Sequence, residues 1–370
     1  MDRRKFVTHA GLAGAAGLLT ACGGNTGASA VECRDGEAAA EAIEWKMVTA
    51  WPRDFPGLGT GANRLAEYIA RLSQGRLKVR VFGGNELVPP LEVFDAVQRG
   101  TAEIGHSTSY YWKGKVPAAQ FFCSAPFGLT AQEINGWLYY GGGLELWREV
   151  YAPFGILPFP CGNSSVQMGG WFNKEINSMA DVQGLKMRIP GMGAEILNRA
   201  GGTPVTMPAS EIYTALQTGA IDATEWVGPY NDLALGLCNA ARYYYYPGWH
   251  ETGSSVEAMI NREAYDALPE DLQAVVEIAA QAANMDMLSE FTFHNAQALK
   301  SLREDHGVEL RAFPDEVMRE FRRIALEYYE EEASRDPAFD RVYRAFRDYY
   351  EMVRPMSAIS EQYVLDLRDR

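Results

Sequence analysis

The chain has 370 residues, of which 34 are lysine or arginine and 48 are aspartate or glutamate, which gives a net charge of −14. This balance argues against nucleic acid as a partner, because nucleic-acid binding depends on basic side chains that neutralise phosphates. A small anionic ligand remains compatible, since it responds to the local field of its pocket rather than to the total charge.

The first 21 residues have the pattern of an export signal. The sequence RRKF at 3–6 fits the twin-arginine motif, and a run rich in glycine, alanine and leucine follows over 10–19. That run is shorter than the roughly 20 residues that a membrane-spanning helix needs. The sequence LTAC ending at Cys22 is similar to a lipobox, in which the cysteine is acylated, and cleavage after residues 28–30 (ASA) is the alternative. Both routes predict an exported, periplasmic protein.

Residues 22–43 are small and polar without an apolar period, which is typical of a flexible tether. The other cysteines have no CxxC spacing, so a zinc site is not expected and no disulfide can be assigned among Cys33, Cys123, Cys161 and Cys238. The remaining residues, 44–370, are more than one hydrophobic core usually holds. We therefore expect two lobes.

The first lobe is predicted to alternate strands and helices. In chain order, the pattern predicts a strand at 44–50, a helix at 60–74, a strand at 77–82, a helix at 91–99, and a strand at 104–105 that leaves into a loop at 108–112. Strands that alternate with helices of this length predict a parallel sheet in an α/β lobe.

The same pattern restarts after Gly162. It predicts a strand at 166–172, a helical turn at 179–182, a strand at 186–189, helices at 193–200 and 209–218, a short strand at 221–224 and a tyrosine-rich strand at 243–246. A second α/β unit predicts a second lobe. Ligand sites in such folds lie in the cleft at the carboxyl ends of strands.

Beyond Pro269 the pattern is helical, over 270–303, 315–333 and 338–353. The last of these helices has apolar side chains along one side, at Val342, Phe346, Tyr349, Tyr350 and Val353. Such a helix either packs across both lobes or contacts a partner, and we expect the first.

Arg188 is the first candidate for a ligand contact, because it lies near the end of an apolar strand between Met187 and Ile189. Arginine presents a planar fork of donors that fits a carboxylate in two parallel bonds. A buried arginine needs an anion. An inter-strand salt bridge to a protein acid is the alternative to a bound organic acid.

Two carboxylates, Glu225 and Glu251, follow strands and stand close to the aromatic residues Trp226 and Trp249. Such a pair fits either the acid and base of a hydrolase or the oxygen ligands of a hard cation. Gln167, at the start of a predicted strand, can add an amide oxygen, although a surface position is the default for glutamine. Spacing alone does not separate these interpretations.

Common catalytic and metal-binding motifs are not found in the sequence. The histidines of the folded part show no HExxH motif or close pairing, so histidine ligation of a metal is not expected (His106, His250, His294 and His306). The sequence also has no GxSxG motif, phosphate-binding loop or dinucleotide fingerprint.

The run GLKMRIPGMGAEILNRAGGTPVTMPASEIYTALQTGAIDATEW over 184–226 is similar to the substrate-binding proteins of TRAP transporters, the DctP-like family. The similarity extends from about Glu44 to the late 350s. The strings SYYW at 109–112, WFNK at 171–174 and WHE at 249–251 resemble the branch that binds 2-oxo acids such as pyruvate and 2-hydroxy acids such as lactate. Each string alone is weak, but their combination is specific.

The resemblance implies roles for individual residues. Arg188 would form a salt bridge with the substrate carboxylate, and a cation would bridge substrate and protein. The positions that match the cation contacts are Gln167, Glu225, the backbone carbonyl of Trp226, and Glu251. Of these, Gln167, Trp226 and Glu251 would also border the substrate, and Tyr111 matches an aromatic contact from the first lobe.

The fold that the resemblance implies is α/β, a type II-like periplasmic binding protein with two lobes, a hinge and a long connecting helix. The lobes would comprise 44–163 plus about 252–293, and 164–251 plus about 294–335. Residues 336–370 would form a C-terminal helix, which some members of this branch exchange in a homodimer. A TRAP membrane permease would be the partner that receives the solute.

The charges of the site favour a cation. The substrate carboxylate, Glu225 and Glu251 carry −3 against +1 for Arg188, a sum of −2, and desolvated like charges in a closed cleft are costly. Calcium would neutralise this sum and sodium would leave −1; charge counting favours calcium and the resemblance favours sodium. We therefore predict a non-enzymatic receptor that captures a small monocarboxylate with its cation. A secreted hydrolase that uses Glu225 and Glu251 as acid and base is the alternative.

Overall fold

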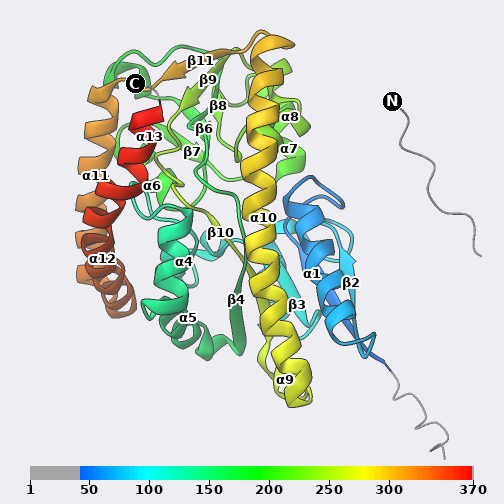
Figure 1. The fold of residues 1–370 in the computed structure, drawn as a ribbon. Helices are drawn as coiled ribbons and strands as arrows, with labels where there is room; N and C mark the ends of the chain where they lie inside the picture. The colour runs from blue at the N-terminus through cyan, green and yellow to red at the C-terminus, as the bar shows by residue number, and fades with distance from the viewer. Residues whose placement is uncertain (1–41, 369–370) are drawn as a thin grey trace, which may run out of the picture. The chain divides into compact units, whose positions relative to one another are not determined.

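Two sheets organise residues 42–368, the part of the chain that the computed structural model describes (Figure 1). The first sheet has the strand order β2-β1-β3-β10-β4, with β1 (Ile43–Thr49), β2 (Leu77–Phe82), β3 (Ile104–Ser107), β4 (Ile156–Asn163) and β10 (Ser255–Asn261). The second has the order β11-β9-β5-β8-β6-β7, with β5 (Gly170–Phe172), β6 (Lys186–Arg188), β7 (Thr203–Val205), β8 (Ala223–Thr224), β9 (Tyr243–Tyr246) and β11 (Glu309–Ala312). The predicted signal peptide and Cys22 lie outside the described residues, as does nearly all of the predicted tether.

Two predictions about the strands are wrong. The sheets are mixed rather than parallel, because β10 runs antiparallel to β3 and β4, and β5 runs antiparallel to β8 and β9. Both strands enter their sheet directly from the other sheet, which reverses their direction. The strand predicted at 166–172 is confined to Gly170–Phe172, because the residues before it cross between the sheets. The other predicted strands and helices are confirmed, with ends that differ by a few residues.

The chain crosses from the first sheet to the second at 164–169 and returns at 247–254. The two crossovers are hydrogen-bonded to each other: the backbone N–H of Ser164 donates to the carbonyl of Ser254, and that of Gln167 donates to the carbonyl of Glu251, each at 3.0 Å. This pairing holds Gln167 and Glu251 opposite each other at the junction of the two sheets.

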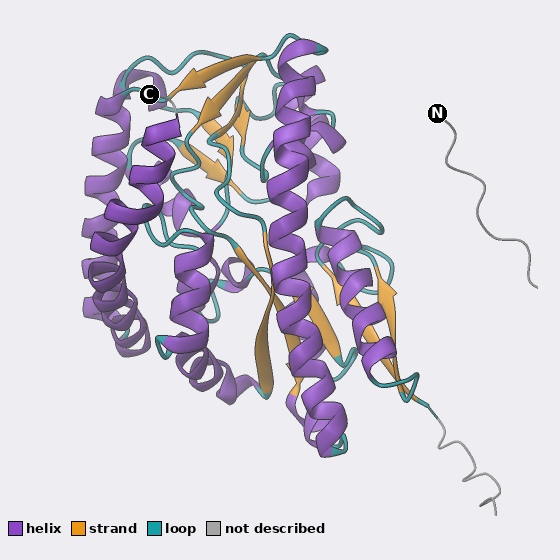
Figure 2. Ribbon diagram, in the orientation of Figure 1, coloured by secondary structure: helices purple, strands orange, loops and turns teal. Residues whose placement is uncertain are grey.

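Helices cover the sheets on both sides (Figure 2). The shorter helices are α1 (Leu58–Leu72), α2 (Val93–Gln98), α3 (Gln120–Cys123), α4 (Ala131–Tyr140), α5 (Gly143–Tyr151), α6 (Gly191–Arg199), α7 (Ala209–Gln217), α8 (Pro229–Ala234) and α9 (Arg262–Asp266). The loop predicted after β3 contains a single 3-10 turn, Ser109–Trp112. No helix among residues 42–368 combines the length and the apolar character that a membrane span requires.

The long helix α10 (Glu270–Glu304) connects the two halves of the structure (Figure 1). Its 35 residues correspond to a length of about 52 Å at 1.5 Å per residue. It packs against β4 and α1 beside the first sheet and against α8 of the second half. One continuous helix therefore contacts both halves of the structure.

The C-terminal helices α11 (Asp315–Arg335) and α12 (Pro337–Ser357) pack on the same chain. The apolar side of α12 buries Phe339, Val342, Tyr343 and Phe346, and the ring of Phe121 from α3 contacts the three aromatic ones. Its contacts with α11, from the second predicted lobe, and with α3, α4 and α5, from the first, agree with the prediction that this helix packs across both lobes. The short helix α13 (Tyr363–Arg368) follows.

Candidate functional site

Arg188 and Glu225 meet at the edge of the second sheet because β6 and β8 are parallel neighbours. Arg188 ends β6 and pairs with Thr224, the last residue of β8, so Glu225 follows directly beside it. The two residues are 1% and 0% exposed and form an ion pair. The structure therefore contains the salt bridge that the sequence offers as one interpretation of Arg188.

Further contacts fix the plane of the Arg188 guanidinium. Its Nε donates to the carbonyl of Met207 at 3.2 Å, and its Nη2 donates to the hydroxyl of Tyr111 at 3.3 Å. The ring of Trp226 lies 5.2 Å from the guanidinium carbon. Tyr111 belongs to the turn after β3, so a residue beside the first sheet and the arginine of the second sheet are in direct contact.

Gln167 and Glu251 lie on the two paired crossovers. Gln167 Nε2 donates to Glu251 Oε2 at 2.7 Å, and the hydroxyl of Ser254 donates to the same oxygen. Gln167 is 5% exposed, so it occupies neither the strand nor the surface position that the sequence favours for it. Its Oε1 has no hydrogen-bond partner within residues 42–368.

His250 is a member of this cluster that sequence reasoning missed. Its Nε2 lies 3.3 Å from Glu225 Oε2, and the side chain is buried. Glu225, His250 and Glu251 each offer one ligand atom within 4.8 Å of the others. His250 has no paired histidine near it in the sequence; its signal is that it directly precedes a candidate acid in the string WHE.

The two buried acids affect each other's charge. Burial and, after it, the negative charge of Glu225 together raise the pKa of Glu251 to about 7. Burial by itself would lower the pKa of Arg188, but Glu225, Tyr111 and Tyr110 together outweigh this effect and the pKa is raised. The charge of Glu251 therefore changes near neutral pH.

A small cavity of about 10 Å³ adjoins these side chains. It is lined by Trp51, Leu58, Thr108, Tyr110, Tyr111, Ser164, Gln167, Trp226, Val227, Glu251, Ser254 and Val256. Thr108 Oγ1, Gln167 Oε1 and Trp226 Nε1 are buried here without a hydrogen-bond partner in the described part of the chain. Ligand pockets usually measure roughly 300–1,000 Å³, so the side chains around this cavity nearly close it, and an acid would need them to move apart.

The donor set of the site fits a hard cation. Gln167 Oε1, the two carboxylates and the backbone carbonyl of Trp226 are all oxygen atoms, which calcium prefers over nitrogen or sulfur. A buried acceptor such as Gln167 Oε1 normally has a donor or an ion next to it. We take this unpartnered oxygen as the observation that favours a cation at this place.

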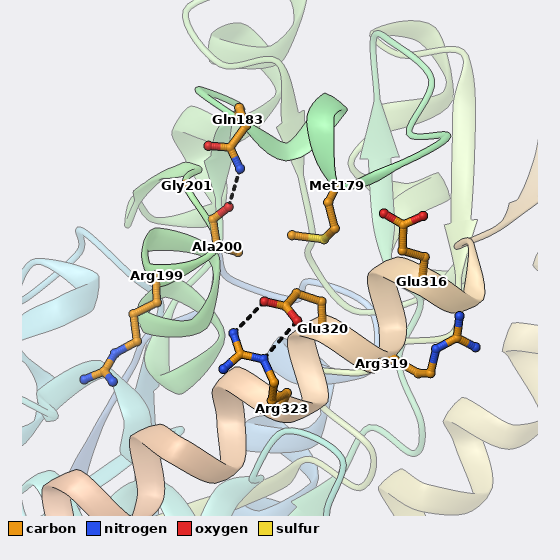
Figure 3. Close-up of a pocket in the computed structure, with 9 residues that line it drawn as sticks. All are labelled: Met179, Gln183, Arg199, Ala200, Gly201, Glu316, Arg319, Glu320 and Arg323. Atoms are coloured by element: carbon orange, nitrogen blue, oxygen red, sulfur yellow. Dashed lines mark hydrogen bonds and ion pairs between the residues drawn. The ribbon is translucent and has the colours of Figure 1, made fainter.

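A larger hollow, of about 670 Å³, lies between the end of α6 and α11 (Figure 3). It opens to the surface, and several of its charged residues are held by ion pairs: Arg323 donates to Glu320, and Arg199 donates to Glu331, which lies outside the hollow. None of the residues that the sequence singled out lines it. The smaller, buried cavity is therefore the better candidate for a solute.

Sequence comparisons identify the family that the chain matches and a close relative. Residues 47–336 match the family described as bacterial extracellular solute-binding protein, family 7. A monocarboxylate 2-oxoacid-binding periplasmic protein of Nostoc sp. is 42% identical over 361 residues, which cover 98% of this chain and 97% of that protein.

Solved structures of TRAP solute-binding proteins are also similar to the chain. One from Bordetella bronchiseptica, with calcium and picolinate, has a TM-score of 0.87 and 38% identity and covers 88% of this chain and 97% of that one. Two others each have a TM-score of 0.86 and 42% identity and cover 88% of this chain and 99% of theirs. The one from Colwellia psychrerythraea contains calcium and pyruvate, and the one from Pseudoalteromonas atlantica contains sodium and pyruvate.

Proposed function

The chain belongs to family 7 of the bacterial extracellular solute-binding proteins, and we propose from this premise that it is a periplasmic TRAP receptor for a small 2-oxo acid such as pyruvate. The acid would bind together with a calcium or sodium ion and pass to the membrane permease. The observation that carries the proposal is the buried cavity between a cationic side chain and a cluster of oxygen ligands. A 2-hydroxy acid such as lactate has the same pair of adjacent oxygen atoms and is the second solute we propose.

The roles of the side chains follow from their chemistry. Arg188 would bind the carboxylate of the acid, with the Tyr111 hydroxyl beside it. Gln167, Glu225, the carbonyl of Trp226, and Glu251 would hold the cation, and Gln167, Trp226 and Glu251 also border the acid. The cation supplies the positive charge that Arg188 alone lacks against two acids and a carboxylate. We propose no catalytic role for Glu225, because a carboxylate held in a buried ion pair with Arg188 is not free to act as the acid or base of a hydrolase.

Closure of the two lobes would enclose the acid. We propose the lobe boundaries expected from the sequence, with the paired crossovers as the hinge. Several contacts join the two halves around the cavity: Lys113 Nζ donates to the carbonyl of Gly191 at 3.0 Å, and Asn231 Nδ2 donates to the carbonyl of Pro56 at 2.8 Å. These contacts exist only when the lobes are together, so the permease can distinguish the closed form.

Pyruvate and calcium together should raise the melting temperature of the protein more than either alone. A ligand at a hundred times its Kd stabilises the native state by about 2.7 kcal/mol, which corresponds to a rise of roughly 5 °C. A thermal-shift series with pyruvate, lactate and acetate, each with calcium, with sodium, and with a chelator, measures this effect. A melting temperature that no small carboxylate changes would contradict the receptor, and turnover of a glycoside without such a change would favour the hydrolase.

Cation binding should weaken as the pH falls below about 7. Burial holds the proton on Glu251 up to that pH, and a cation must displace this proton to use the carboxylate. The apparent calcium affinity should therefore fall about tenfold per pH unit below 7 and level off above it. Calcium titrations at fixed pyruvate between pH 5 and 9 measure the profile. A flat profile in the wild type, or an equally steep one in Glu251→Gln, would contradict the assignment.

Export by the twin-arginine route and a lipid anchor at Cys22 are further proposals, which rest on the sequence RRKF and the lipobox-like LTAC. Both lie outside the described residues. The mass of the mature protein tests the anchor, because acylation and cleavage before Cys22 give a different mass from cleavage after residue 30.

A homodimer through the C-terminal segment is the last of these proposals. Beyond α12's buried part, the chain presents large apolar side chains that are half or more exposed, at Met352, Met356, Ile359, Tyr363 and Leu365. Apolar surface of this kind commonly marks a contact with another protein. Sedimentation of the purified protein tests it, and a monomer at every concentration would contradict it.

A further inference from the structure

Three buried polar side chains are linked by hydrogen bonds beside the first sheet. The indole Nε1 of Trp112 donates to the Tyr151 hydroxyl at 2.7 Å, and that hydroxyl donates to Glu257 Oε1 at 3.1 Å. They come from three elements: Trp112 ends the turn after β3, Tyr151 ends α5, and Glu257 lies in the middle of β10. All three are buried, and none of them lines the solute cavity. We call these three residues the Glu257 network.

Glu257 is a buried acid that forms no ion pair in the part of the chain that the structure describes. There its carboxyl is hydrogen-bonded only to Tyr151, and its Oε2 has no partner. Burial raises the pKa of this carboxyl well above its usual range, and the hydrogen bond from Tyr151 offsets only part of the rise. An apolar side chain would occupy the place at a lower cost, because burying a polar group with few partners is unfavourable. The position of Glu257 is therefore better explained by what it holds than by the stability it adds.

The network holds the turn that carries Tyr111. Arg188 Nη2 donates to the Tyr111 hydroxyl at 3.3 Å, so this turn reaches the guanidinium that we place at the acid. The turn is weakly held by its own backbone, since the N–H of Tyr111 donates to the carbonyl of Thr108 at 3.3 Å, beyond the usual range of roughly 2.7–3.2 Å. Its geometry therefore depends on side-chain anchors.

The turn has one such anchor at each end. At its start, the Ser109 hydroxyl donates to the carbonyl of Ala119 at 2.7 Å. At its end, the Trp112 ring packs against Phe94 with centroids 5.1 Å apart, and its Nε1 is bound to Tyr151. Packing of apolar surface is non-directional, so the ring contact alone lets the indole shift, whereas the hydrogen bond fixes its orientation.

We propose that Glu257 is a positioning residue for the solute, and that it acts on Tyr111 through its network. This inference rests on the proposed function. A hydroxyl has a single proton, and because Tyr151 gives its proton to Glu257, the lone pairs of the hydroxyl oxygen remain for Trp112. Without the carboxyl, the Tyr151 hydroxyl rotates freely and no longer presents a fixed acceptor to the indole. The turn then loses its second anchor.

Calorimetric titrations with pyruvate at saturating calcium test the proposal. Tyr111→Phe removes the contact itself and should weaken binding roughly tenfold, as expected for one hydrogen bond to a charged group. Glu257→Leu and Tyr151→Phe should each weaken it by roughly three- to tenfold, because they displace the same contact. Glu257→Gln keeps a neutral acceptor for Tyr151 and should recover most of the affinity that Glu257→Leu loses.

A double-mutant cycle separates positioning from a general loss of stability. If Glu257 acts through Tyr111, adding Glu257→Leu or Tyr151→Phe to Tyr111→Phe should weaken binding by less than roughly twofold more, whereas independent effects would multiply. Tyr329→Phe is the matched control, because it removes another buried tyrosine hydroxyl, which donates to the carbonyl of Pro126 at 3.0 Å and is not part of the network. It should bind pyruvate like the wild type.

The outcomes distinguish this inference from the function on which it rests. A wild type that does not bind pyruvate overturns the proposed function. A wild type that binds it, while folded Glu257→Leu and Tyr151→Phe bind equally well, overturns the positioning role and leaves the function standing. Losses that multiply fully with that of Tyr111→Phe, a Glu257→Gln as weak as Glu257→Leu, or an equal loss in Tyr329→Phe also overturn the role. Tyr151→Phe decides the question alone if Glu257→Leu does not fold.

Discussion

Replacing Arg188 by alanine is expected to abolish binding of the acid, with a loss of roughly a thousandfold in affinity. The guanidinium is the cationic group that we place at the carboxylate, and removing one partner of a buried, hydrogen-bonded charge pair costs about 2–5 kcal/mol. Each 1.4 kcal/mol is a factor of ten. Calorimetry with pyruvate at saturating calcium measures the change, and micromolar affinity in a folded Arg188→Ala protein would contradict the role.

The control for this variant must separate binding from folding, because alanine leaves Glu225 without its ion-pair partner in the core. Arg188→Lys keeps the charge but not the planar fork, so it should fold while binding pyruvate roughly ten- to a hundredfold more weakly. Arg242, also beside the second sheet, is 69% exposed and paired with Glu309. Arg242→Ala should bind like the wild type.

Glu225→Gln is expected to weaken acid binding at saturating calcium by roughly a hundredfold and to make the remaining binding less dependent on calcium. The carboxylate both balances Arg188 and offers oxygen to the cation. The amide keeps an oxygen but removes one negative charge, so the sum over Arg188, the remaining acid and the bound carboxylate changes from −2 to −1. Because less negative charge then remains to be neutralised, binding of the acid should depend less on the cation.

Pyruvate titrations at several calcium concentrations distinguish these two effects. The wild-type affinity should rise steeply with calcium, and that of Glu225→Gln should rise only slightly. Glu309→Gln, in the exposed pair that supplies the arginine control, should retain the wild-type dependence. An equally steep dependence in Glu225→Gln would show that Glu225 does not serve the cation.

The sequence was sufficient to predict that Arg188 and Glu225, at the edge of the second sheet, belong to one site. Arg188 and Glu225 each follow from a local pattern, an apolar strand that ends in a polar residue, and parallel neighbouring strands bring such ends together. That β6 and β8 are neighbours cannot be predicted from either strand alone, but the fold implied by the family resemblance places them together. The class of solute came from the same resemblance.

The contact between Gln167 and Glu251 on the two crossovers could not be predicted in the same way. The sequence predicts Gln167 on a strand over 166–172, yet only the last three of these residues pair with neighbours in the sheet. The preceding residues pair with a segment about 85 positions later, where Gln167 meets Glu251. The periodicity of a short sequence segment cannot predict a contact between residues so far apart in the chain. The contact of His250 with Glu225 was missed for the same reason.

The pairing of the two crossovers has a mechanical consequence. Two separate tethers would let the lobes slide, splay or rotate freely, whereas a hydrogen-bonded ribbon resists sliding along its length and yields most readily to twist. Gln167 and Glu251 are a hydrogen-bonded pair at this joint. A cation bound between them would add a further connection between the same two crossovers, so the ion that helps to hold the acid would also stiffen the joint.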